Sequence, residues 1–199
     1  MTAADAAPAA AAALAAGLSL GLLAGGRATR LGGADKAWAI FAGQSLFART
    51  VAALAPQHAF AARMVSANRD LQRYASHDFV AIADRRADFP GPLAGIEAML
   101  AVCQTAQLLT LPIDLRTIPS DLVTRLLAAG EGGAVACDAS GAQPLVAIWP
   151  VERARPVVAD ALARGQGAVH RVVAALGLAV VPFAGTVFGN LNTPEDLQA

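Results

Sequence analysis

The sequence predicts an α/β fold, with one domain built on a mostly parallel sheet that helices cover on both faces. Short apolar runs of strand length alternate with segments of helical periodicity, and short connections join them. No internal repeat or change of composition divides the 199 residues, and this length is sufficient for one domain with a sizeable core. Alternation of this kind is typical of doubly covered parallel sheets.

The predicted strands are apolar runs bounded by Gly, Pro, Ser, Asn or Asp. They span residues 18–23, 62–66, 79–83, 107–111, 133–138, 144–149 and 178–183. The polar pair Ser140-Gly141 separates two of these runs and predicts a turn between them.

The predicted helices begin and end at recognisable signals. Pro56 stops the first helix, Asn68 is a candidate N-cap for the second, and Pro92 suits the first position of the third. The helices are predicted over residues 44–54, 68–74, 92–103, 119–129, 151–164 and 168–176, with a short terminal helix opening at Thr193.

Residues 1–17 form an alanine-rich segment, which we expect to be a poorly ordered tail or a frayed helix, so that the domain spans 18–199. The segment carries Asp5 and has no basic region at its start, which is unlike a secretory signal peptide. Residues 18–199 contain no apolar run near the length of a membrane span.

Charge and cysteine content exclude several classes of partner. The formal net charge is zero, which gives no case for a nucleic-acid or anionic-membrane surface. Cys103 and Cys137 are far apart and lack metal-ligand spacing, so reduced thiols in a cytoplasmic protein are the default interpretation.

The stretch from Leu18 to Lys36 runs from an apolar strand into a loop rich in glycine and arginine. Glycine lets backbone N–H groups approach closely and point inward, and Arg and Lys offset negative charge, so such a loop can hold phosphates. Lys36 is the only lysine in the chain, which indicates a site that uses a compact point charge. The loop matches neither the Walker nor the G-x-G-x-x-G pattern, so a flexible surface loop remains the alternative.

Polar side chains follow the next predicted strands. Ser66 and Asn68 follow the second, Asp84 the third and Asp114 the fourth. Ligands of α/β sheets bind beyond the carboxyl ends of the strands, where these groups would form a pocket. A carboxylate beside bound phosphates predicts Mg²⁺, and Asp114 is the best candidate ligand. The alternative for any single acid is a cap or a turn former.

Asn190 and Asn192 alternate near the C-terminus, so both side chains can project to one face of an extended segment. They could contact the metal, the nucleotide or a second substrate. The alternative is that they are turn residues leading to a cap at Thr193.

Together these segments resemble the molybdenum cofactor guanylyltransferase family, within the wider group of α/β nucleotidyltransferases with a Rossmann-like fold. The matching segments run in family order over nearly the whole chain from Leu18. They are Leu23-Ala24-Gly25-Gly26, Arg30-Leu31-Gly32-Gly33 with Asp35-Lys36, Pro90-Gly91-Pro92-Leu93-Ala94-Gly95, Asp114 after an apolar strand, Gln143-Pro144-Leu145, and Asn190 to Leu197.

The resemblance implies a Mg²⁺-dependent enzyme that transfers GMP from GTP to the phosphate of molybdopterin and releases pyrophosphate. It implies Mg²⁺ as cofactor, GTP and Mo-molybdopterin as partners, and transient contact with molybdoenzymes or their chaperones, without nucleic acid or membrane. The LAGG segment favours guanine, because the related cytidylyltransferases look like LAAG there.

The site residues carried over by the resemblance fall into four groups. The catalytic pair is Lys36 and Asp114. The nucleotide-binding residues are Leu23, Ala24, Gly25, Gly26, Arg30, Lys36, Ser66, Asn68, Asp84, Gly95 and Asp114. The metal ligands are Asp114 and Asn192, and the acceptor-binding residues are Gln143, Asn190 and Asn192.

The chain departs from the family pattern at two loops. Ser66 stands where the family often has the first Asn of Asn-x-Asn, and Leu115-Arg116 stands where Thr-Pro is usual after the aspartate. Two further hypotheses therefore stay open: a related nucleotidyltransferase with another base or acceptor, such as a cytidylyltransferase, and a non-catalytic protein that binds the nucleotide or the pterin.

Overall fold

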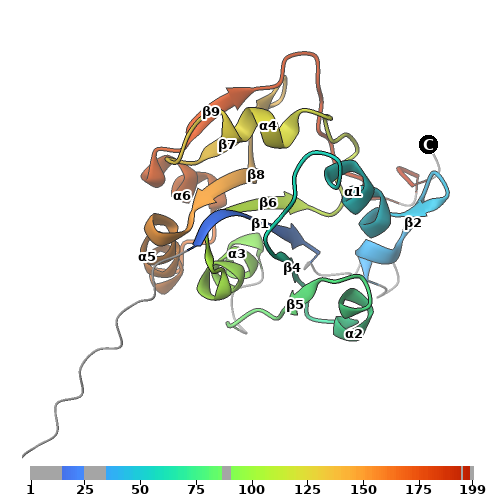
Figure 1. The fold of residues 1–199 in the computed structure, drawn as a ribbon, viewed down its shortest axis with the longest axis horizontal. Coiled ribbons are helices and arrows are strands. Elements are labelled where there is room, and N and C mark those ends of the chain that lie inside the picture. Colours follow the sequence, from blue (N-terminus) through green and yellow to red (C-terminus); the bar gives the residue numbers. More distant parts are fainter. Residues whose placement is uncertain (1–14, 25–34, 87–90, 194, 198–199) are drawn as a thin grey trace, which may run out of the picture.

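The computed structural model describes residues 15–24, 35–86, 91–193 and 195–197, and a seven-stranded sheet of order β5-β4-β1-β6-β8-β7-β9 forms its centre (Figure 1). β1 (Ala15–Leu23) pairs in parallel with β4 (Arg63–Ser66) on one side and β6 (Thr105–Pro112) on the other. β5 (Val80–Ile82) extends this parallel half beside β4. The carboxyl ends of these four strands therefore meet at one edge of the sheet.

The other half of the sheet contains the one strand that runs in reverse. β8 (Gly141–Pro150) is antiparallel both to β6 and to β7 (Ala134–Asp138), with which it forms a hairpin. β9 (Ala179–Pro182) pairs in parallel with β7 at the edge of the sheet. Because β7 is parallel to β6, its last residue, Asp138, lies at the same end of the sheet as the carboxyl ends of β1, β4, β5 and β6.

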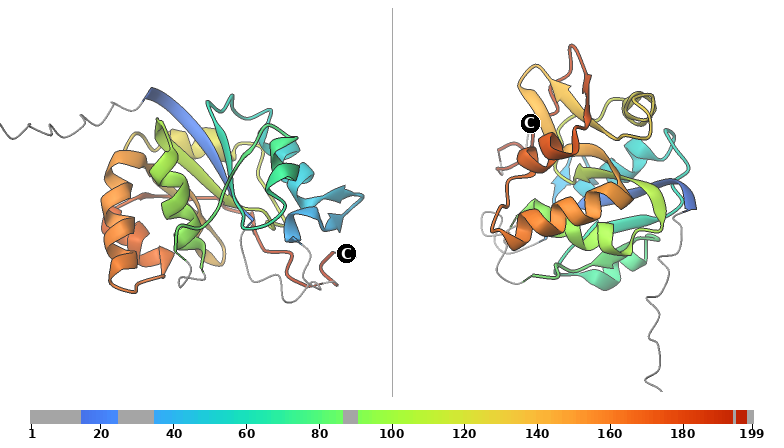
Figure 2. Two further views of the ribbon diagram at one scale, coloured as in Figure 1. Left: turned by 90° about the horizontal axis from the view of Figure 1, so that it is seen from below. Right: turned by 90° about the vertical axis from the view of Figure 1, so that its left-hand side faces the viewer.

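Three helices cover one face of the sheet. α3 (Pro92–Val102), α5 (Val151–Ala163) and α6 (Val169–Leu176) pack on a core that includes Leu108 and Trp149 of the sheet (Figures 1 and 2). α3 is buried almost all round because it lies between the sheet and α5. Proline at its first turn replaces a donor that would have no helical partner.

The opposite face carries α1 (Leu46–Leu54), α2 (Leu71–Ala75) and α4 (Leu122–Leu127), together with the 3-10 turn η2 (Lys36–Trp38). Ser45 caps α1, because its hydroxyl accepts from the N–H of Ala48 at 3.1 Å. A small hairpin of β2 (Ile40–Phe41) and β3 (Gln44–Ser45) precedes this helix and projects from the domain (Figure 2). The predicted α/β fold, with a mostly parallel sheet covered on both faces, is confirmed.

Several predicted boundaries are wrong for local reasons. The first strand begins at Ala15 and not at Leu18, because Ala15 pairs with Thr105 across an irregularity in the ladder. Gly17 sits there at φ 129°, a conformation that favours glycine. Because alanine has a low strand propensity, the sequence assigned residues 15–17 to the tail. Pairing with β6 makes them part of the strand instead. The rest of that segment, residues 1–14, lies outside the described residues.

The helix predicted to open at Thr193 is also wrong, since Glu195 to Leu197 form a turn in the part of the chain that the structure describes. The capping signal is nevertheless present, because the Thr193 hydroxyl accepts from the N–H of Asp196 at 3.2 Å. The Asp196 carboxylate in turn accepts from the N–H groups of Asn192 and Thr193 at 2.9 and 3.0 Å.

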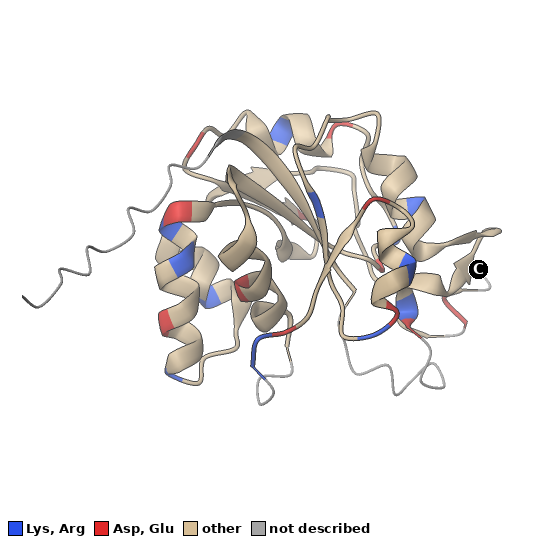
Figure 3. Cartoon of the chain, turned by 60° about the horizontal axis from the view of Figure 1, so that its bottom comes forward, with Lys and Arg blue, Asp and Glu red and all other residues tan. Residues whose placement is uncertain are grey.

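Charged residues of both signs are interspersed over the helices and loops seen in Figure 3. Among the described residues, no helix is both long and apolar enough to cross a membrane.

Candidate active site

The predicted polar residues lie at one edge of the sheet, as expected from parallel strands. Ser66 ends β4, Asp84 follows β5, Ala24 follows β1 and Asp114 follows β6. The ladder continues into the site, because the N–H of Ala24 donates to the Ser66 carbonyl at 3.1 Å and the N–H of Ile113 donates to that of Leu23 at 3.1 Å. This edge is where α/β sheets bind ligands.

Lys36, Asp114 and Asn192 converge at this edge. The Lys36 Nζ lies 2.5 Å from Asp114 Oδ2 and 2.8 Å from Asn192 Oδ1. The Lys36 and Asp114 side chains are 21% and 16% exposed, so the pair is largely shielded but still partly accessible to solvent. The ammonium therefore lies directly against the carboxylate, whereas the sequence predicts only that both groups lie at one phosphate site.

Asp114 is held by the loop that follows β6. The Arg49 Nη1 donates to the Leu115 carbonyl at 2.7 Å, and its Nη2 donates to the Arg116 carbonyl. Burial, with the nearby charge of Arg116, lowers the pKa of the Arg49 guanidinium. Its cationic carbon also lies 5.3 Å from the centre of the Phe41 ring. A guanidinium fork thus fixes two successive carbonyls, in the loop where the chain departs from the family pattern.

Asn192 is brought to Lys36 by a chain segment that pairs with the same loop. Asn190 and Leu115 form an antiparallel bridge, and the N–H of Leu191 donates to the Asp114 carbonyl at 2.8 Å. An ion pair of 2.9 Å between Arg116 and Asp196 joins the two segments again. Of the two predicted asparagines, Asn192 reaches the lysine through its side chain, while Asn190 contacts Leu115 through its backbone.

The predicted nucleotide residues of the neighbouring strands form a second cluster. Asn68 and Asp84 are reciprocally bonded, because the Asn68 amide donates to Asp84 Oδ2 at 3.0 Å and accepts from the Asp84 N–H at 3.0 Å. Ser66 Oγ lies 3.5 Å from Asp84 Oδ1. A Cβ on Gly95 would lie 2.2 Å from that Ser66 Oγ, so α3 approaches β4 more closely than any other residue would allow. The structure brings Ser66, Asn68, Asp84 and Gly95 together.

Sequence reasoning missed one residue at this edge, Asp138 at the end of β7. Its carboxylate accepts from the Ser140 hydroxyl at 2.6 Å, the Ser140 N–H at 2.8 Å, the Gln143 amide at 3.0 Å and the Phe188 N–H at 2.8 Å. Burial alone would raise its pKa, but these donors together lower the pKa of Asp138 to about 2. The sequence contained a signal for this residue, because Asp138 lies at the end of a predicted strand. Asp84 and Asp114 were predicted as site residues from the same kind of position.

Gln143, predicted to bind the acceptor, belongs to the Asp138 cluster. Its amide nitrogen lies 3.0 Å from both Asp138 Oδ1 and Ser140 Oγ, so its donors serve the β7–β8 hairpin. Gly25, Gly26 and Arg30, predicted to bind the nucleotide, lie outside the described residues.

The side chains of the candidate site can be compared with the ligands that a divalent cation requires. The residues described here contain no group of three or more His, Cys, Asp or Glu side chains that could hold a metal. Two oxygens, Asp114 Oδ2 and Asn192 Oδ1, do converge on a single positive charge, the Lys36 ammonium. Hard oxygen donors of this kind fit Mg²⁺ when phosphate oxygens and water complete the shell, which is how this ion is usually held beside nucleotides.

A known protein family matches most of the chain. The family model described as "MobA-like NTP transferase domain" matches residues 21–180, so the chain is a nucleotidyltransferase by family. A protein of Shewanella sp. (strain ANA-3) named molybdenum cofactor guanylyltransferase is 36% identical over 183 residues, covering 89% of this chain and 91% of that protein. One of the same name from Rhodopseudomonas palustris (strain BisB5) is 38% identical over 194 residues, covering 88% and 89%. The chain belongs to the molybdenum cofactor guanylyltransferase family.

Solved structures share the fold at lower identity. Molybdopterin-guanine dinucleotide biosynthesis protein A from Archaeoglobus fulgidus is similar with a TM-score of 0.68 and 21% identity, over 90% of this chain and 95% of that one. The 2-C-methyl-D-erythritol 4-phosphate cytidylyltransferase from Thermus thermophilus is similar with a TM-score of 0.67 and 18% identity, over 92% and 96%. At these identities the likeness concerns the fold alone.

Proposed function

We propose that this protein transfers GMP from GTP to the phosphate of molybdopterin and releases pyrophosphate, as a Mg²⁺-dependent guanylyltransferase. Membership of the molybdenum cofactor guanylyltransferase family supports the reaction. The observation that carries the site is the convergence of Lys36, Asp114 and Asn192 from three distant parts of the chain at the ligand-binding edge of the sheet.

The reaction needs positioning and charge neutralisation more than covalent chemistry. An oxygen of the molybdopterin phosphate forms a bond to the α-phosphorus of GTP. The bond from that phosphorus to the bridging β-oxygen breaks, and pyrophosphate leaves with the electron pair. Since the attacking phosphate is already an anion, no general base is required.

Lys36 is a cation that the described part of the chain supplies to the phosphates. Its ammonium is preorganised by Asp114 and Asn192, and it can turn from these oxygens to phosphate oxygens when GTP binds. Asp114 and Asn192 would then hold Mg²⁺, which supplies further neutralisation of charge on the triphosphate. Ser66, Asn68, Asp84 and Gly95 form the neighbouring cluster, beside which we place the nucleoside. Location in the cytoplasm and transient contact with molybdoenzymes or their chaperones stay predictions.

A nucleotide panel tests the proposal. GTP, CTP and UTP are each incubated with Mg²⁺ and molybdopterin, and pyrophosphate release is measured. We expect release with GTP alone. Preference for CTP would instead support a cytidylyltransferase, and no release with any nucleotide would support a non-catalytic binding protein. Omitting Mg²⁺ should abolish release, and Asp114→Asn should need more Mg²⁺ for the same rate.

Lys36→Ala tests the residue assignment. We expect a loss in kcat of about 10²–10³-fold, the size found when one preorganised donor to developing charge is removed. The matched control is Arg164→Ala, which breaks an ion pair with Asp160 on the exposed surface of α5 and should leave the rate unchanged. Activity of Lys36→Ala near that of the unmodified protein would reject its role.

A further inference from the structure

Lys36 is carried by η2, a single 3-10 turn of three residues, Lys36 to Trp38. Such a short turn has little stability of its own, so its position depends on contacts outside it. Asp35 is its N-cap, and both carboxylate oxygens are used. Oδ1 accepts from the N–H of Ala37 at 3.0 Å, and Oδ2 accepts from the hydroxyl of Tyr74 at 2.7 Å.

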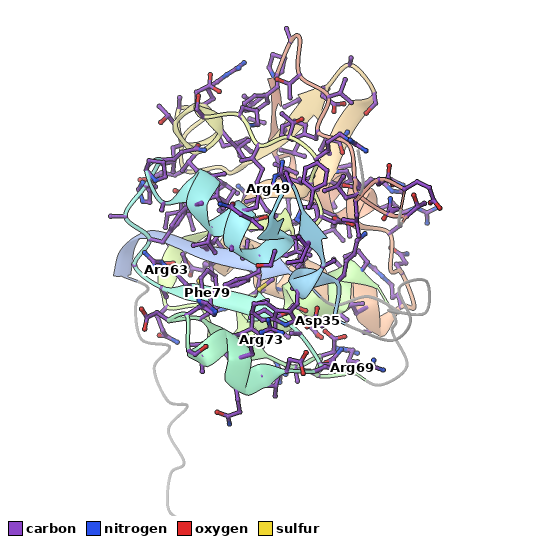
Figure 4. All side chains as sticks on the ribbon, turned by 90° about the vertical axis from the view of Figure 1, so that its right-hand side faces the viewer. Asp35, Arg49, Arg63, Arg69, Arg73 and Phe79 are labelled. Carbon is purple, nitrogen blue, oxygen red and sulfur yellow. The ribbon has the colours of Figure 1, made fainter. Side chains whose placement is uncertain are left out.

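Tyr74 comes from α2, on the same face of the sheet, and it is fully buried. Its ring centre lies 5.0 Å from that of Trp38, the last residue of η2, and 5.5 Å from that of Phe47 in α1. One tyrosine therefore contacts the residue before Lys36 through its hydroxyl and the end of the same turn through its ring. Figure 4 shows Asp35 beside α2, near Arg73, whose guanidinium carbon lies 3.8 Å from the centre of the Trp38 ring.

We propose that Tyr74 is a positioning residue for Lys36: through Asp35 and Trp38 it fixes η2 so that, in the absence of nucleotide, the ammonium stays directed at Asp114 and Asn192. A phenylalanine would fill the same space and keep the ring contacts, so packing alone does not require the hydroxyl. Burial and then the bond to Asp35 raise the pKa of Tyr74, so its hydroxyl remains a donor throughout the working pH range.

The test uses the fact that Lys36 is the only lysine. An amine-selective acylating reagent is applied, and acylation of Lys36 is followed over time by peptide mass spectrometry. We expect Tyr74→Phe to raise the labelling rate about tenfold, because loss of a hydrogen bond to a charged group corresponds to roughly that factor in the population of the held state. Asp114→Ala is the positive control, since it removes the ion-pair partner itself.

The matched control is Ser19→Ala, which breaks another buried hydroxyl contact, the 2.7 Å bond to Thr105 in the sheet. It should lower stability by a similar amount and leave Lys36 labelling unchanged. Labelling of Tyr74→Phe at the rate of the unmodified protein would overturn the proposal, as would an equal increase in Ser19→Ala.

A second experiment measures turnover, and it rests on the proposed function. We expect kcat of Tyr74→Phe to fall about tenfold, and the same change to have no further effect in a Lys36→Ala background, because there is no ammonium left to position. A purely structural role would give equal losses in both backgrounds and would overturn the proposal. Faster labelling in Tyr74→Phe, with no nucleotidyl transfer by the unmodified protein, would support the positioning role and reject the proposed function.

Discussion

Substitution of Gly95 by alanine should reveal how closely α3 approaches β4 at the candidate nucleotide site. A Cβ at this position would lie 2.2 Å from Ser66 Oγ, 2.9 Å from Ser66 Cβ and 3.5 Å from a methyl group of Leu23. Rotation of the Ser66 hydroxyl could relieve the first contact. The contact with Ser66 Cβ remains, so α3 and β4 have to separate by about half an ångström to reach ordinary contact distance.

Two opposing contributions set the change in the free energy of unfolding that Gly95→Ala causes. Overpacking of this kind costs about 1–3 kcal/mol, and two contacts below 3.0 Å place Gly95→Ala at the upper end of that range. Alanine in place of glycine inside a helix stabilises by about 1 kcal/mol. The net expectation is a loss of about 2 kcal/mol in the free energy of unfolding, or roughly 4–8 °C in Tm for a chain of this length.

Urea denaturation followed by circular dichroism measures this difference. In a Ser66→Gly background the blocking atoms are absent, so Gly95→Ala should there become stabilising by about 1 kcal/mol. Gly91→Ala is the control, because the space around its Cβ is open and its φ of −177° suits any residue. As Gly91 is the N-cap of α3, where alanine is less favourable than glycine, Gly91→Ala should lower the free energy of unfolding by roughly 0.5 kcal/mol. A stabilising Gly95→Ala in the unmodified background would refute the close approach.

Two other substitutions test the loops around the site. Asp138 has a folded-state pKa of about 2, so its ionised form contributes stability that is complete above the ordinary value of about 3.9 and is lost as pH falls towards 2. Asp138→Asn should remove that part of the pH dependence between roughly pH 4 and pH 2, measured by urea denaturation across a pH series, and an unchanged profile would contradict the assignment. Arg49→Met should lower the free energy of unfolding by about 1–3 kcal/mol, because two partly buried carbonyls, those of Leu115 and Arg116, lose their donor. Arg49→Lys should recover only part of this loss in thermal denaturation, since an ammonium cannot reproduce the fork, and full recovery would show that charge alone matters.

The carboxyl ends of the predicted strands lie within one residue of the observed ends, because apolar runs and the polar residues after them are local features. Asp84 and Asp114 could be placed at the edge of the sheet for that reason. Asp138 also ends a predicted strand, but its contact with the Phe188 N–H, 50 residues away, depends on tertiary packing. Direct contact of Lys36 with Asp114 could not be predicted, because the direction of a long side chain depends on how η2 is anchored.

The sequence alone determined the alternation of strands and helices, the end of the sheet at which the candidate site residues lie, and the family to which the chain belongs. Only the tertiary structure decided that β8 runs in reverse, that β1 lies between β4 and β6, and that Lys36 meets partners 78 and 156 residues away. Hydrophobic periodicity is a property of neighbouring residues, whereas strand order and side-chain partners follow from the packing of distant segments against one another.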